Sequence, residues 1–401
     1  MESSSDRPQV AVIGGGPAGL IAAEVIAGAR LPVTVFERMP SLGRKFLMAG
    51  RGGLNLTHSE PIGRFVTRYG AASGWMKPLL EALPPAALIA WCEELGQPTF
   101  VGTSGRVFPK AMKASPLLRA WLGRLQDLGV RFVTRAVWTG WDETGALAFA
   151  DGSRFSATAA VLALGGASWP RLGSDGGWTK LLPDITIAPL RPANCGFRVA
   201  WSDPFRSRHA GAPLKSIAVS FNDQRVRSEA MITEAGIEGG AIYALSAALR
   251  EAIERDGSAL LRIDLRPDLD PETVAKRLNG PRRGASLANY LRRQIGLSPV
   301  AIGLVQEALH AGETGPLQDL VKALPLRLTA PFDIACAIST AGGIALNEID
   351  GHLMLRKRPG VFVAGEMLDW EAPTGGYLLQ GCMATGVAAG KGLLRWVGAG
   401  S

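Results

Sequence analysis

A glycine-rich turn between two short apolar runs near the N-terminus constrains the fold of this chain most strongly. Residues 10–13 form the first run, and Gly14, Gly16 and Gly19 follow in the spacing Gly-x-Gly-x-x-Gly. An Ala-rich stretch then leads to a second apolar run at residues 33–36. This order of strand, tight turn, helix and strand is typical of the βαβ unit of a Rossmann-like parallel sheet. The sequence therefore predicts an α/β fold with a dinucleotide site at the first turn.

Each glycine of this turn meets a different steric demand. Gly14 permits the sharp turn out of the strand, Gly16 lets a pyrophosphate approach the backbone, and Gly19 lets the helix pack closely on the sheet. Glu37 follows the second run, 18 positions after Gly19, close to the spacing of about 20 residues expected for a carboxylate that binds ribose hydroxyls. Because a carboxylate repels a 2′-phosphate, we expect an unphosphorylated adenosine there.

The length and the cysteines set further limits. At 401 residues, the chain is too long for one ordinary core, so two or three domains are expected. Its four cysteines are far apart and form no C-x-x-C motif, which argues against a dithiol centre or a zinc site. We expect no metal and a cytoplasmic protein, because a reducing compartment suits such cysteines. A monomer is favoured.

Neither a membrane segment nor a nucleic-acid surface is predicted. The apolar N-terminal stretch contains Glu24 and is broken by three consecutive glycines, so it is neither a membrane span nor a signal peptide. The net charge is +8, with basic groups at residues 282–283, 292–293 and 356–358. These groups are scattered along the sequence and not interleaved with aromatic residues, which does not favour nucleic-acid binding. A small-molecule substrate is expected instead.

The pattern of hydrophobic and polar residues changes twice along the chain. We assign residues 1–190 and 334–401 to a nucleotide-binding domain formed from both chain ends. Residues 191–242 and 325–333 alternate like antiparallel strands and predict a β-barrel-like substrate domain. Residues 243–324 have a mostly helical pattern and are interpreted as a helical insertion.

A second strong signal lies at residues 360–392. A buried run ends there in Gly365-Glu366, and Gly375-Gly376 opens a long Ala/Gly-rich helix after a loop. This order places a carboxylate and a helix N-terminus at the carboxyl edge of the same sheet. In a flavin site, Glu366 can hydrogen-bond ribityl or phosphate-linked hydroxyls. The N–H groups near Tyr377 can stabilise negative charge at flavin N1 and O2.

These motifs resemble those of the NAD(P)/FAD-dependent oxidoreductases of the HI0933-like group (the BaiN and aminoacetone oxidase type), in particular a branch with the motif GRKFLMAGRGGLNLTH. The resemblance covers nearly the whole chain. It rests on an ordered set of motifs: GGGPAGL at Gly14, GRKFLMAGRGGLNLT at Gly43, GRVFPKAMKAS at Gly105, LALGGASWP at Leu162, TEAGIEGGAI at Thr233, STAGGIALNEI at Ser339 and VAGEMLDWEAPTGGY at Val363.

The resemblance implies tightly bound FAD in a two-dinucleotide-binding domain of the glutathione-reductase type, with a β-barrel-like domain and a helical domain inserted. By motif matching, Arg44 and Lys45 would bind the phosphate and ribityl region, and Asn55 the flavin side. Gly165 and Gly166 would mark the return of the chain beneath the cofactor. The full set of predicted cofactor-binding residues is Gly14, Gly16, Pro17, Ala18, Gly19, Glu37, Arg38, Arg44, Lys45, Asn55, Val137, Gly165, Gly166, Gly365, Glu366, Gly375, Gly376 and Tyr377.

Two departures from better-studied members bear on the substrate. Those members carry Arg-Cys-Asn where this chain has Gly53-Leu54-Asn55, so no cysteine lies beside the flavin at that point. They also tend to have Gly-Asp-Gly after the ALGG strand, whereas the acid is displaced within residues 173–178 of this chain. The substrates of those members therefore do not carry over to this chain. No catalytic residue is nominated.

The main hypothesis is an FAD-dependent oxidoreductase that transfers a hydride between a small organic substrate and flavin N5. Family members act on amines or on activated double bonds, and the sequence does not choose between these. Because the chain has no second Gly-x-Gly-x-x-Gly unit, NAD(P)H would dock only transiently. Two alternatives stay open: a non-catalytic flavin-binding module of redox or RNA-associated type, and an NAD-dependent dehydrogenase without flavin.

Overall fold

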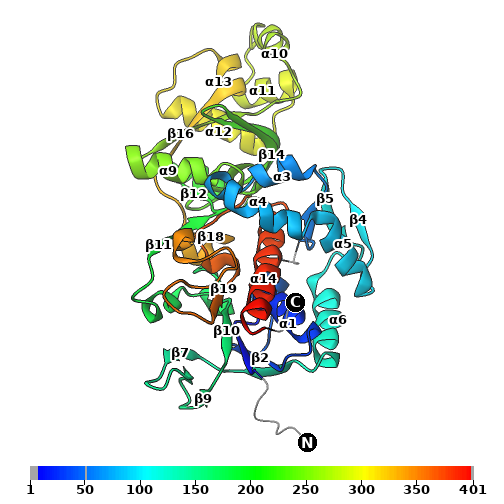
Figure 1. Ribbon diagram of the computed structural model, residues 1–401. Helices are drawn as coiled ribbons and strands as arrows, with labels where there is room; N and C mark the ends of the chain where they lie inside the picture. Colours follow the sequence, from blue (N-terminus) through cyan, green and yellow to red (C-terminus); the bar gives the residue numbers. More distant parts are fainter. Residues whose placement is uncertain (1–7, 50–51, 399–401) are drawn as a thin grey trace, which may run out of the picture. The chain divides into compact units, whose positions relative to one another are not determined.

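The chain forms two compact units (Figure 1). The computed structural model describes residues 8–49 and 52–398. The first unit is the described part of Met1–Arg191 and Ser339–Ser401, and the second is Pro192–Ile338. Gly50 and Arg51, within the GRKFLMAGRGGLNLT motif, lie outside the described residues. The second unit is thus an insertion within the chain of the first.

A five-stranded sheet in the order β19–β10–β1–β2–β6 forms the centre of the first unit, and its strand pairs are all parallel. The strands are β1 (Val10–Ile13), β2 (Val33–Glu37), β6 (Arg131–Thr134), β10 (Ala159–Leu162) and β19 (Val361–Val363). Every residue of β1, β10 and β19 is buried, as expected for parallel strands covered on both faces. The predicted α/β class with a Rossmann-like sheet is confirmed.

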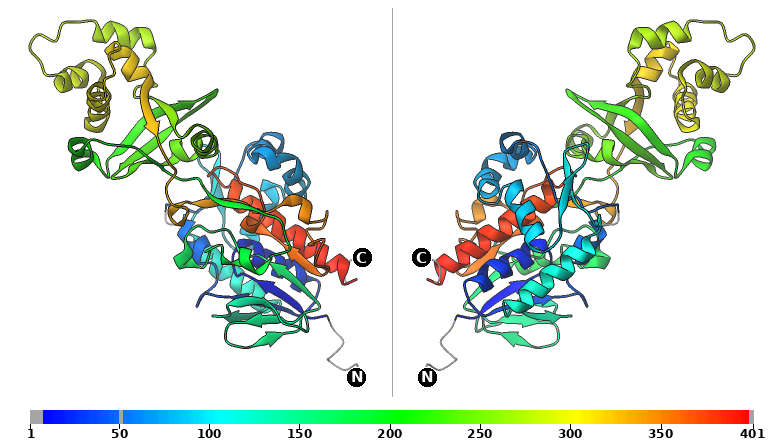
Figure 2. Two further views of the ribbon diagram at one scale, coloured as in Figure 1. Left: turned by 90° about the vertical axis from the view of Figure 1, so that its left-hand side faces the viewer. Right: turned by 90° about the vertical axis from the view of Figure 1, so that its right-hand side faces the viewer.

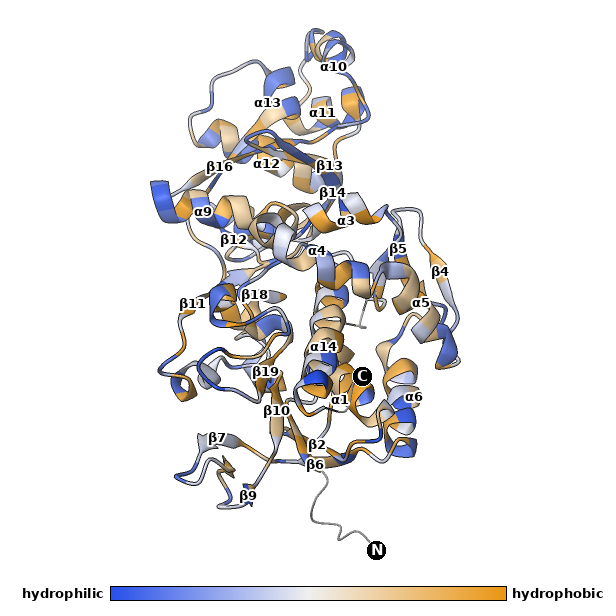
Figure 3. Ribbon diagram, viewed as in Figure 1, coloured by the Kyte–Doolittle hydropathy of each residue, from blue (hydrophilic) through white to orange (hydrophobic). Residues whose placement is uncertain are grey.

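Two helices from opposite ends of the chain lie together on this sheet. α1 (Pro17–Gly28) connects β1 to β2, and α14 (Tyr377–Trp396) packs alongside α1 (Figure 2). Glycines in α14 permit this close approach, since a Cβ on Gly386 would lie 2.4 Å from the Ala18 carbonyl oxygen. Figure 3 shows mostly hydrophobic residues along α1 and α14. Both ends of the chain therefore contribute to one core.

The other helices of the first unit surround this core. Glu24, the acid inside α1, accepts hydrogen bonds from Trp121 Nε1 (2.6 Å) and Arg124 (3.1 Å), which fastens α6 (Ala114–Asp127) to α1. The remaining helices are α2 (Arg44–Ala49), α3 (Ile62–Thr67), α4 (Ser73–Ala82) and α5 (Pro85–Glu94). Three small sheets complete the unit: β3 (Thr57–His58), β5 (Arg106–Pro109) and β4 (Thr99–Val101); β7 (Trp138–Trp141), β8 (Leu147–Phe149) and β9 (Arg154–Phe155); and β11 (Ile187–Ala193) with β18 (Ser339–Ile344).

The second unit contains a six-stranded antiparallel sheet in the order β12–β15–β14–β13–β16–β17. Its strands are β12 (Phe197–Arg198), β13 (Pro213–Phe221), β14 (Gln224–Thr233), β15 (Gly236–Glu238), β16 (Ala259–Asp264) and β17 (Leu324–Leu328). The residues after β17 return to β12: the Arg198 N–H donates to Ala330 (2.8 Å) and the Thr329 N–H to Arg198 (3.1 Å). The sheet therefore curls into a half-barrel.

The helices of this unit do not form a region of their own. They are α7 (Asp203–His209), α8 (Gly240–Tyr243), α9 (Ser246–Asp256), α10 (Pro271–Leu278), α11 (Leu287–Ile295), α12 (Pro299–His310) and α13 (Leu317–Ala323). They share one buried core with the sheet. This differs from the predicted division into a β-barrel-like domain and a helical insertion at residues 243–324. The difference arises because β16, inside that segment, pairs with both β13 and β17.

No helix within residues 8–49 and 52–398 combines the length and the apolar character needed to cross a membrane.

Candidate functional site

A cavity of about 320 Å³ lies in the first unit at the carboxyl edge of the parallel sheet. Its lining includes the ends of β1 and β2 and the residues that follow β10 and β19. This edge is where ligands bind in open α/β sheets. Twelve of the predicted cofactor-binding residues line the cavity: Gly14, Gly16, Pro17, Ala18, Glu37, Arg38, Arg44, Lys45, Val137, Gly165, Gly365 and Glu366.

The three glycines of the first turn differ in their surroundings. A Cβ on Gly14 would lie 2.2 Å from the Ala163 carbonyl oxygen, and one on Gly19 would lie 2.0 Å from the Gly14 carbonyl oxygen. Nothing lies within 4 Å of a Cβ on Gly16, which is the N-cap of α1. Gly14 and Gly19 thus permit close backbone packing, while Gly16 leaves open space beside the free N–H groups of the helix.

Glu37 lies at the end of β2 with both carboxylate oxygens in hydrogen bonds. Oε2 accepts from the Gly15 N–H (2.9 Å) and Oε1 from the Met39 N–H (2.8 Å). Burial raises the pKa of Glu37 above its ordinary value, against the opposing effects of these N–H groups and of Arg38 and Arg44. Because each oxygen has a second lone pair, the carboxylate can still accept hydrogen bonds from a ligand.

An ion pair lies at the cavity beside Glu37. Arg38 NH1 is 2.5 Å from Asp175 Oδ2, and both side chains are partly exposed. Burial alone would raise the pKa of Asp175, but the Gly177 N–H and the Arg38 guanidinium outweigh it and lower that pKa. The loop after β10 is thereby attached to the loop after β2. Asp175, the acid that is displaced within residues 173–178, is thus paired with Arg38.

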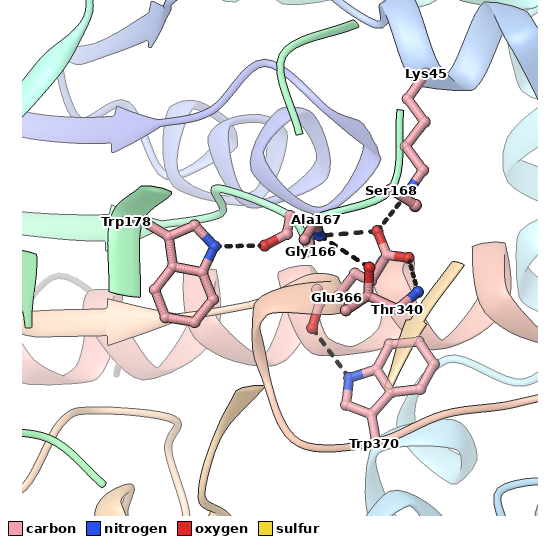
Figure 4. A network of polar contacts seen from close by, with 10 residues as sticks. Lys45, Gly166, Ala167, Ser168, Trp178, Thr340, Glu366 and Trp370 are labelled. Carbon is pink, nitrogen blue, oxygen red and sulfur yellow. Dashed lines mark hydrogen bonds and ion pairs between the residues drawn. The ribbon is translucent and has the colours of Figure 1, made fainter. Parts of the chain in front are cut away.

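Glu366 is the centre of a polar network at the other end of the cavity (Figure 4). Its Oε2 lies 2.6 Å from Lys45 Nζ and accepts a longer hydrogen bond from the Gly166 N–H (3.4 Å). Oε1 accepts from the Thr340 N–H (2.9 Å), and Lys45 Nζ also donates to Ser168 Oγ (2.6 Å). The network holds three distant segments of the chain around one carboxylate.

Three residues that line the cavity each have a buried side-chain polar atom with no hydrogen-bond partner among the described residues. These atoms are Arg44 Nε, Trp138 Nε1 and Ser174 Oγ. Such atoms are rare, and leaving one unsatisfied costs about 1–3 kcal/mol. Because the arginine and indole N–H groups can only donate, a molecule that satisfies them must carry hydrogen-bond acceptors.

Asn55 and the predicted residues at the start of α14 lie outside the cavity lining, whereas Gly365 and Glu366 of the predicted flavin end belong to it. The Asn55 amide nitrogen donates to the Thr57 carbonyl (3.0 Å), and its oxygen accepts from the Gly376 N–H (3.3 Å). Asn55 therefore ties the segment around β3 to the start of α14. The other predicted residues outside the lining are Gly19, Gly166, Gly375, Gly376 and Tyr377.

Tyr377, the first residue of α14, belongs to a second polar cluster. Its hydroxyl donates to Glu60 Oε1 (2.6 Å), and Arg68 donates to both Glu60 oxygens (2.9 and 2.7 Å). Burial, together with Glu60, raises the pKa of Tyr377. His58 accepts from the Glu60 N–H at Nδ1 (3.1 Å), and its Nε2 faces the Ser104 carbonyl (3.0 Å). Both ring nitrogens of His58 are thus engaged by the protein.

Cys382 lies in the lining of the cavity, on α14. Burial raises the pKa of its thiol to about 12, so the thiol is neutral at physiological pH. A neutral buried thiol is a weak nucleophile. Within the described part of the chain, no three His, Cys, Asp or Glu side chains are grouped to hold a metal.

Sequence reasoning missed Trp138 and Ser174, although both line the cavity. Trp138 directly follows the predicted Val137, and Ser174 lies in the glycine-rich loop after β10. A tryptophan or serine in such a place gives no sign in the sequence that its polar atom will be buried without a partner. That property depends on what surrounds the side chain in the fold.

The sequence and the fold are similar to those of known proteins. The profile of the HI0933-like protein Rossmann domain matches residues 8–392. Over 410 residues, the chain is 27% identical to a 3-dehydro-bile acid delta(4,6)-reductase of Clostridium scindens, with 96% of this chain and 98% of that protein covered. Over 410 residues it is also 24% identical to a ribosomal RNA dihydrouridine synthase of Escherichia coli, with 97% and 98% covered.

Among solved structures, the fold is similar to that of a flavocytochrome c3 fumarate reductase in its open conformation. The TM-score is 0.52 at 16% identity, with 98% of this chain and 79% of that chain covered. It is also similar to a 3-ketosteroid delta1-dehydrogenase of Sterolibacterium denitrificans, with a TM-score of 0.52 at 14% identity and coverage of 98% and 100%. At these identities, the likeness shows the fold alone.

Proposed function

This chain belongs to the HI0933-like family, a family of FAD-dependent oxidoreductases, and from this premise we propose that its cavity binds FAD and that it reduces an activated carbon–carbon double bond. The observation that carries FAD binding is the set of buried, unpartnered polar atoms on residues that line the cavity, Arg44 Nε, Trp138 Nε1 and Ser174 Oγ. FAD offers phosphate, ribose and adenine acceptors to each of them. The residues present therefore fit the cofactor.

The adenosine half would lie along the first turn. Gly16 leaves room at the N-terminus of α1, where free N–H groups and the helix dipole favour a pyrophosphate. Glu37 would accept hydrogen bonds from the ribose hydroxyls with its remaining lone pairs. The guanidinium of Arg44, which keeps its Nε unpartnered, would donate to a phosphate oxygen.

The flavin half would lie toward Glu366 and α14. Lys45 and Glu366 would fix the ribityl region, because their 2.6 Å contact holds both charged groups in place. Asn55 accepts from the Gly376 N–H and so sets the position of the α14 N-terminus. The first-turn N–H groups that follow would stabilise negative charge on the reduced ring.

FAD, when bound, supplies hydride transfer between its N5 atom and the substrate. The names of the curated relatives, a delta(4,6)-reductase and a dihydrouridine synthase, both describe reductions. For this chain we therefore favour reduction over amine oxidation: a hydride adds to one carbon of a double bond conjugated to a carbonyl, and a proton adds to the other. A transiently docked NADH or NADPH would supply the two electrons.

The test is a substrate screen that follows flavin absorbance. We expect a yellow protein whose flavin bleaches with NADH or NADPH without oxygen and recovers its colour with an α,β-unsaturated ketone. Bleaching by amines in place of nicotinamides would overturn the direction of the reaction. A colourless protein that takes up no FAD would overturn the cofactor assignment and favour an NAD dehydrogenase. A yellow protein that no nicotinamide or amine reduces would favour a non-catalytic flavin-binding module.

A further inference from the structure

Arg106, on β5 of the first unit, is a half-buried cation whose side chain forms no hydrogen bond or ion pair with a described residue. Every other half-buried or buried arginine or lysine within residues 8–49 and 52–398 has at least one such partner or an electrostatic one. Lys322, for example, is 2.8 Å from Asp264 Oδ2. Withdrawing a charge from water without a partner costs free energy. This cost distinguishes Arg106 from the other cations of the protein.

The side chain of Arg106 shares one face of its small sheet with His58. The two residues lie directly opposite each other on β5 and β3, and the adjacent opposite pair, Thr57 and Val107, is fully buried. Successive side chains of a strand alternate between faces, whereas directly opposite residues lie on the same face. On this face, the ring of His58 stacks on that of Tyr377, with 5.5 Å between the ring centres. Arg106 therefore lies on the face that meets the start of α14.

Packing holds Arg106 beside the N-terminus of α14. Its Nε atom lies 3.9 Å from the position of a Cβ on Gly375, the residue before the N-cap Gly376. Thr57 Oγ1 donates to Gln380 Oε1 in α14 (2.7 Å), and a Cβ on Gly376 would lie 2.5 Å from the Thr57 Cα atom. Because β3 packs this tightly on α14 and pairs with β5, the position of Arg106 is well defined.

This position is electrostatically unfavourable for a cation in the protein alone. The N-terminus of a helix carries a partial positive charge, and the first turn of α14 contains no acidic residue. The nearby carboxylate of Glu60 already accepts from Tyr377 and Arg68 and lies 3.4 Å from Arg64 Nε. Arg106 thus adds a full positive charge to a helix end that is already positive. Its charge becomes favourable when a negative charge forms at the same place.

We propose that Arg106 stabilises the negative charge that the flavin ring acquires on reduction. The proposal rests on the FAD site described above, in which the first N–H groups of α14 face N1 and O2 of the ring. Hydride transfer from NADH or NADPH oxidises the nicotinamide and brings two electrons and one proton to flavin N5. The ring, neutral before, then carries one negative charge on N1 and O2. Arg106 adds a full charge to the partial charges of the helix end.

The lack of a protein partner increases the effect of Arg106 on the flavin. The oxidised ring has no formal charge, so the guanidinium interacts weakly with it and strongly with the reduced ring. A carboxylate paired with Arg106 would cancel much of this difference. A fixed charge that is already in place also requires no rearrangement when the electrons arrive. The unpaired cation therefore raises the reduction potential of the flavin and favours its reduction by a nicotinamide.

The test measures the midpoint potential of the full-length, FAD-loaded protein. The protein is reduced with dithionite without oxygen in the presence of a dye of known potential, and absorbance reports both. R106M removes the charge and keeps a side chain that covers the same apolar surface. We expect the equilibrium constant for two-electron reduction to fall by a factor of about 10, which corresponds to a potential about 30 mV lower. The measurement requires neither nicotinamide nor substrate.

Two matched variants separate the charge at this position from other effects. R106K keeps the charge without the planar guanidinium, and it should retain most of the potential. R131M removes an exposed arginine at the start of β6, at the amino edge of the parallel sheet, and should leave the potential unchanged. An unchanged potential in R106M, or an equal fall in R131M, would overturn the proposal. An equal fall in R106K and R106M would overturn charge as the cause.

The FAD-free protein provides an independent measurement. Because R106M relieves the repulsion between Arg106 and the helix end, its thermal unfolding midpoint should be about 1–2 °C higher than that of the unmodified protein. R106K retains the repulsion and should not show this rise. A lower midpoint in R106M would mean that the arginine stabilises the fold, and it would overturn the account of an uncompensated charge.

The outcomes also distinguish this inference from the proposed reaction. If no enone is reduced while R106M still lowers the potential, the inference stands and the proposed substrate class fails. An unchanged potential in R106M with slower reoxidation of the flavin by an enone would overturn the flavin as the partner of Arg106 in favour of a substrate oxygen. A protein that takes up no FAD would overturn the cofactor assignment and this inference together.

Discussion

Lys45 and Glu366 form an ion pair with a 2.6 Å contact although they are 321 positions apart in the chain. Their side chains are 27% and 12% exposed, so the pair is partly shielded from water. Lys45 belongs to α2, and Glu366 follows β19 at the carboxyl edge of the sheet. The contact therefore joins, at the cavity, a segment near the N-terminus to a segment near the C-terminus.

We expect K45M to lower the free energy of unfolding by about 2 kcal/mol, because it leaves a partly buried carboxylate without its cation. It should also weaken FAD binding. The double variant K45M/E366Q should recover part of the stability, which a double-mutant cycle in urea would measure. Lys77 and Glu81, an exposed pair on α4, provide the control, and K77M should have little effect. No recovery in the double variant would contradict the pairing.

Close backbone packing at Gly14 and Gly19 predicts that alanine is not tolerated at either position. G14A and G19A would place a Cβ 2.2 and 2.0 Å from carbonyl oxygens. We expect each variant to lose about 2–3 kcal/mol of stability in urea unfolding, or to remain unfolded. G28A is the control, since nothing lies within 4 Å of its Cβ and Gly28, like Gly19, belongs to α1. It should be neutral or stabilise the protein by about 0.5–1 kcal/mol.

Glu37 should make FAD binding depend on pH. Its pKa in the folded, FAD-free protein is raised above 4.5 by burial. Ribose hydroxyls donate to the carboxylate and so favour the ionised form, which means that protonation of Glu37 competes with FAD. FAD affinity should therefore be highest above the raised pKa and fall as the pH drops through it.

Variants at Glu37 test this account by titration of apoprotein with FAD. E37A should weaken FAD binding by a factor of about 10–100, the cost of lost hydrogen bonds to a charged group. E37Q cannot titrate, so its FAD affinity should not change with pH in that range. E143A removes an exposed carboxylate of the same unit and should leave FAD affinity unchanged. Unaltered FAD content in E37A would contradict the assignment.

Two serines near the site should respond oppositely to the same substitution. Ser174 Oγ is buried without a partner, so S174A should leave the FAD-free protein equally stable or more stable. Ser168 Oγ accepts from Lys45 (2.6 Å), so S168A should destabilise it by about 1 kcal/mol. If Ser174 contacts FAD, S174A should weaken FAD binding by a factor of about 5–10. Thermal unfolding with and without FAD measures both effects, and a loss of apoprotein stability in S174A would count against the idea.

Glu60 should make the stability of the protein fall in acid. Burial alone would raise the pKa of Glu60, but hydrogen bonds from Arg68 and Tyr377 outweigh it and hold that pKa below 4.5. A lowered pKa in the folded state means that the stabilisation is complete above 4.5 and disappears as the pH falls through the lowered pKa. E60Q should lower the free energy of unfolding at neutral pH by about 1–3 kcal/mol.

The pH dependence of the stability gives a more specific test of the role of Glu60. The difference in stability between the unmodified protein and E60Q, measured by urea unfolding, should shrink on acidification below 4.5. Y377F removes only one of the donors and should show a smaller difference. A constant difference across this range would contradict the role of the ionised carboxylate.

Local patterns in the sequence were sufficient to predict the part of the site that belongs to the first βαβ unit. The turn at Gly14, the start of α1 at Gly16 and the carboxylate of Glu37 follow from glycine spacing and from two short apolar runs. Their geometry is set by residues that are neighbours in the chain or belong to one βαβ unit. The α/β class follows for the same reason, because a parallel strand pair needs a crossover helix.

Other features depend on contacts between distant segments. The sequence predicts a strand at residues 260–265 within the mostly helical segment, but not that this strand, β16, pairs with β13 and β17, because pairing depends on distant residues. Asn55, which is predicted on the flavin side, has an amide that ties β3 to Gly376, a contact that no local pattern in the sequence indicates.

The sequence by itself determined the parallel sheet, the dinucleotide turn and the candidate carboxylates, because steric limits on glycine and the burial of apolar runs act over a few residues. Only the tertiary structure decided that Lys45 meets Glu366 and that Arg44, Trp138 and Ser174 line one cavity while a polar atom of each is buried without a partner. Burial and hydrogen-bond satisfaction are properties of the whole packed environment. They depend on which distant side chains arrive, and no local pattern records that.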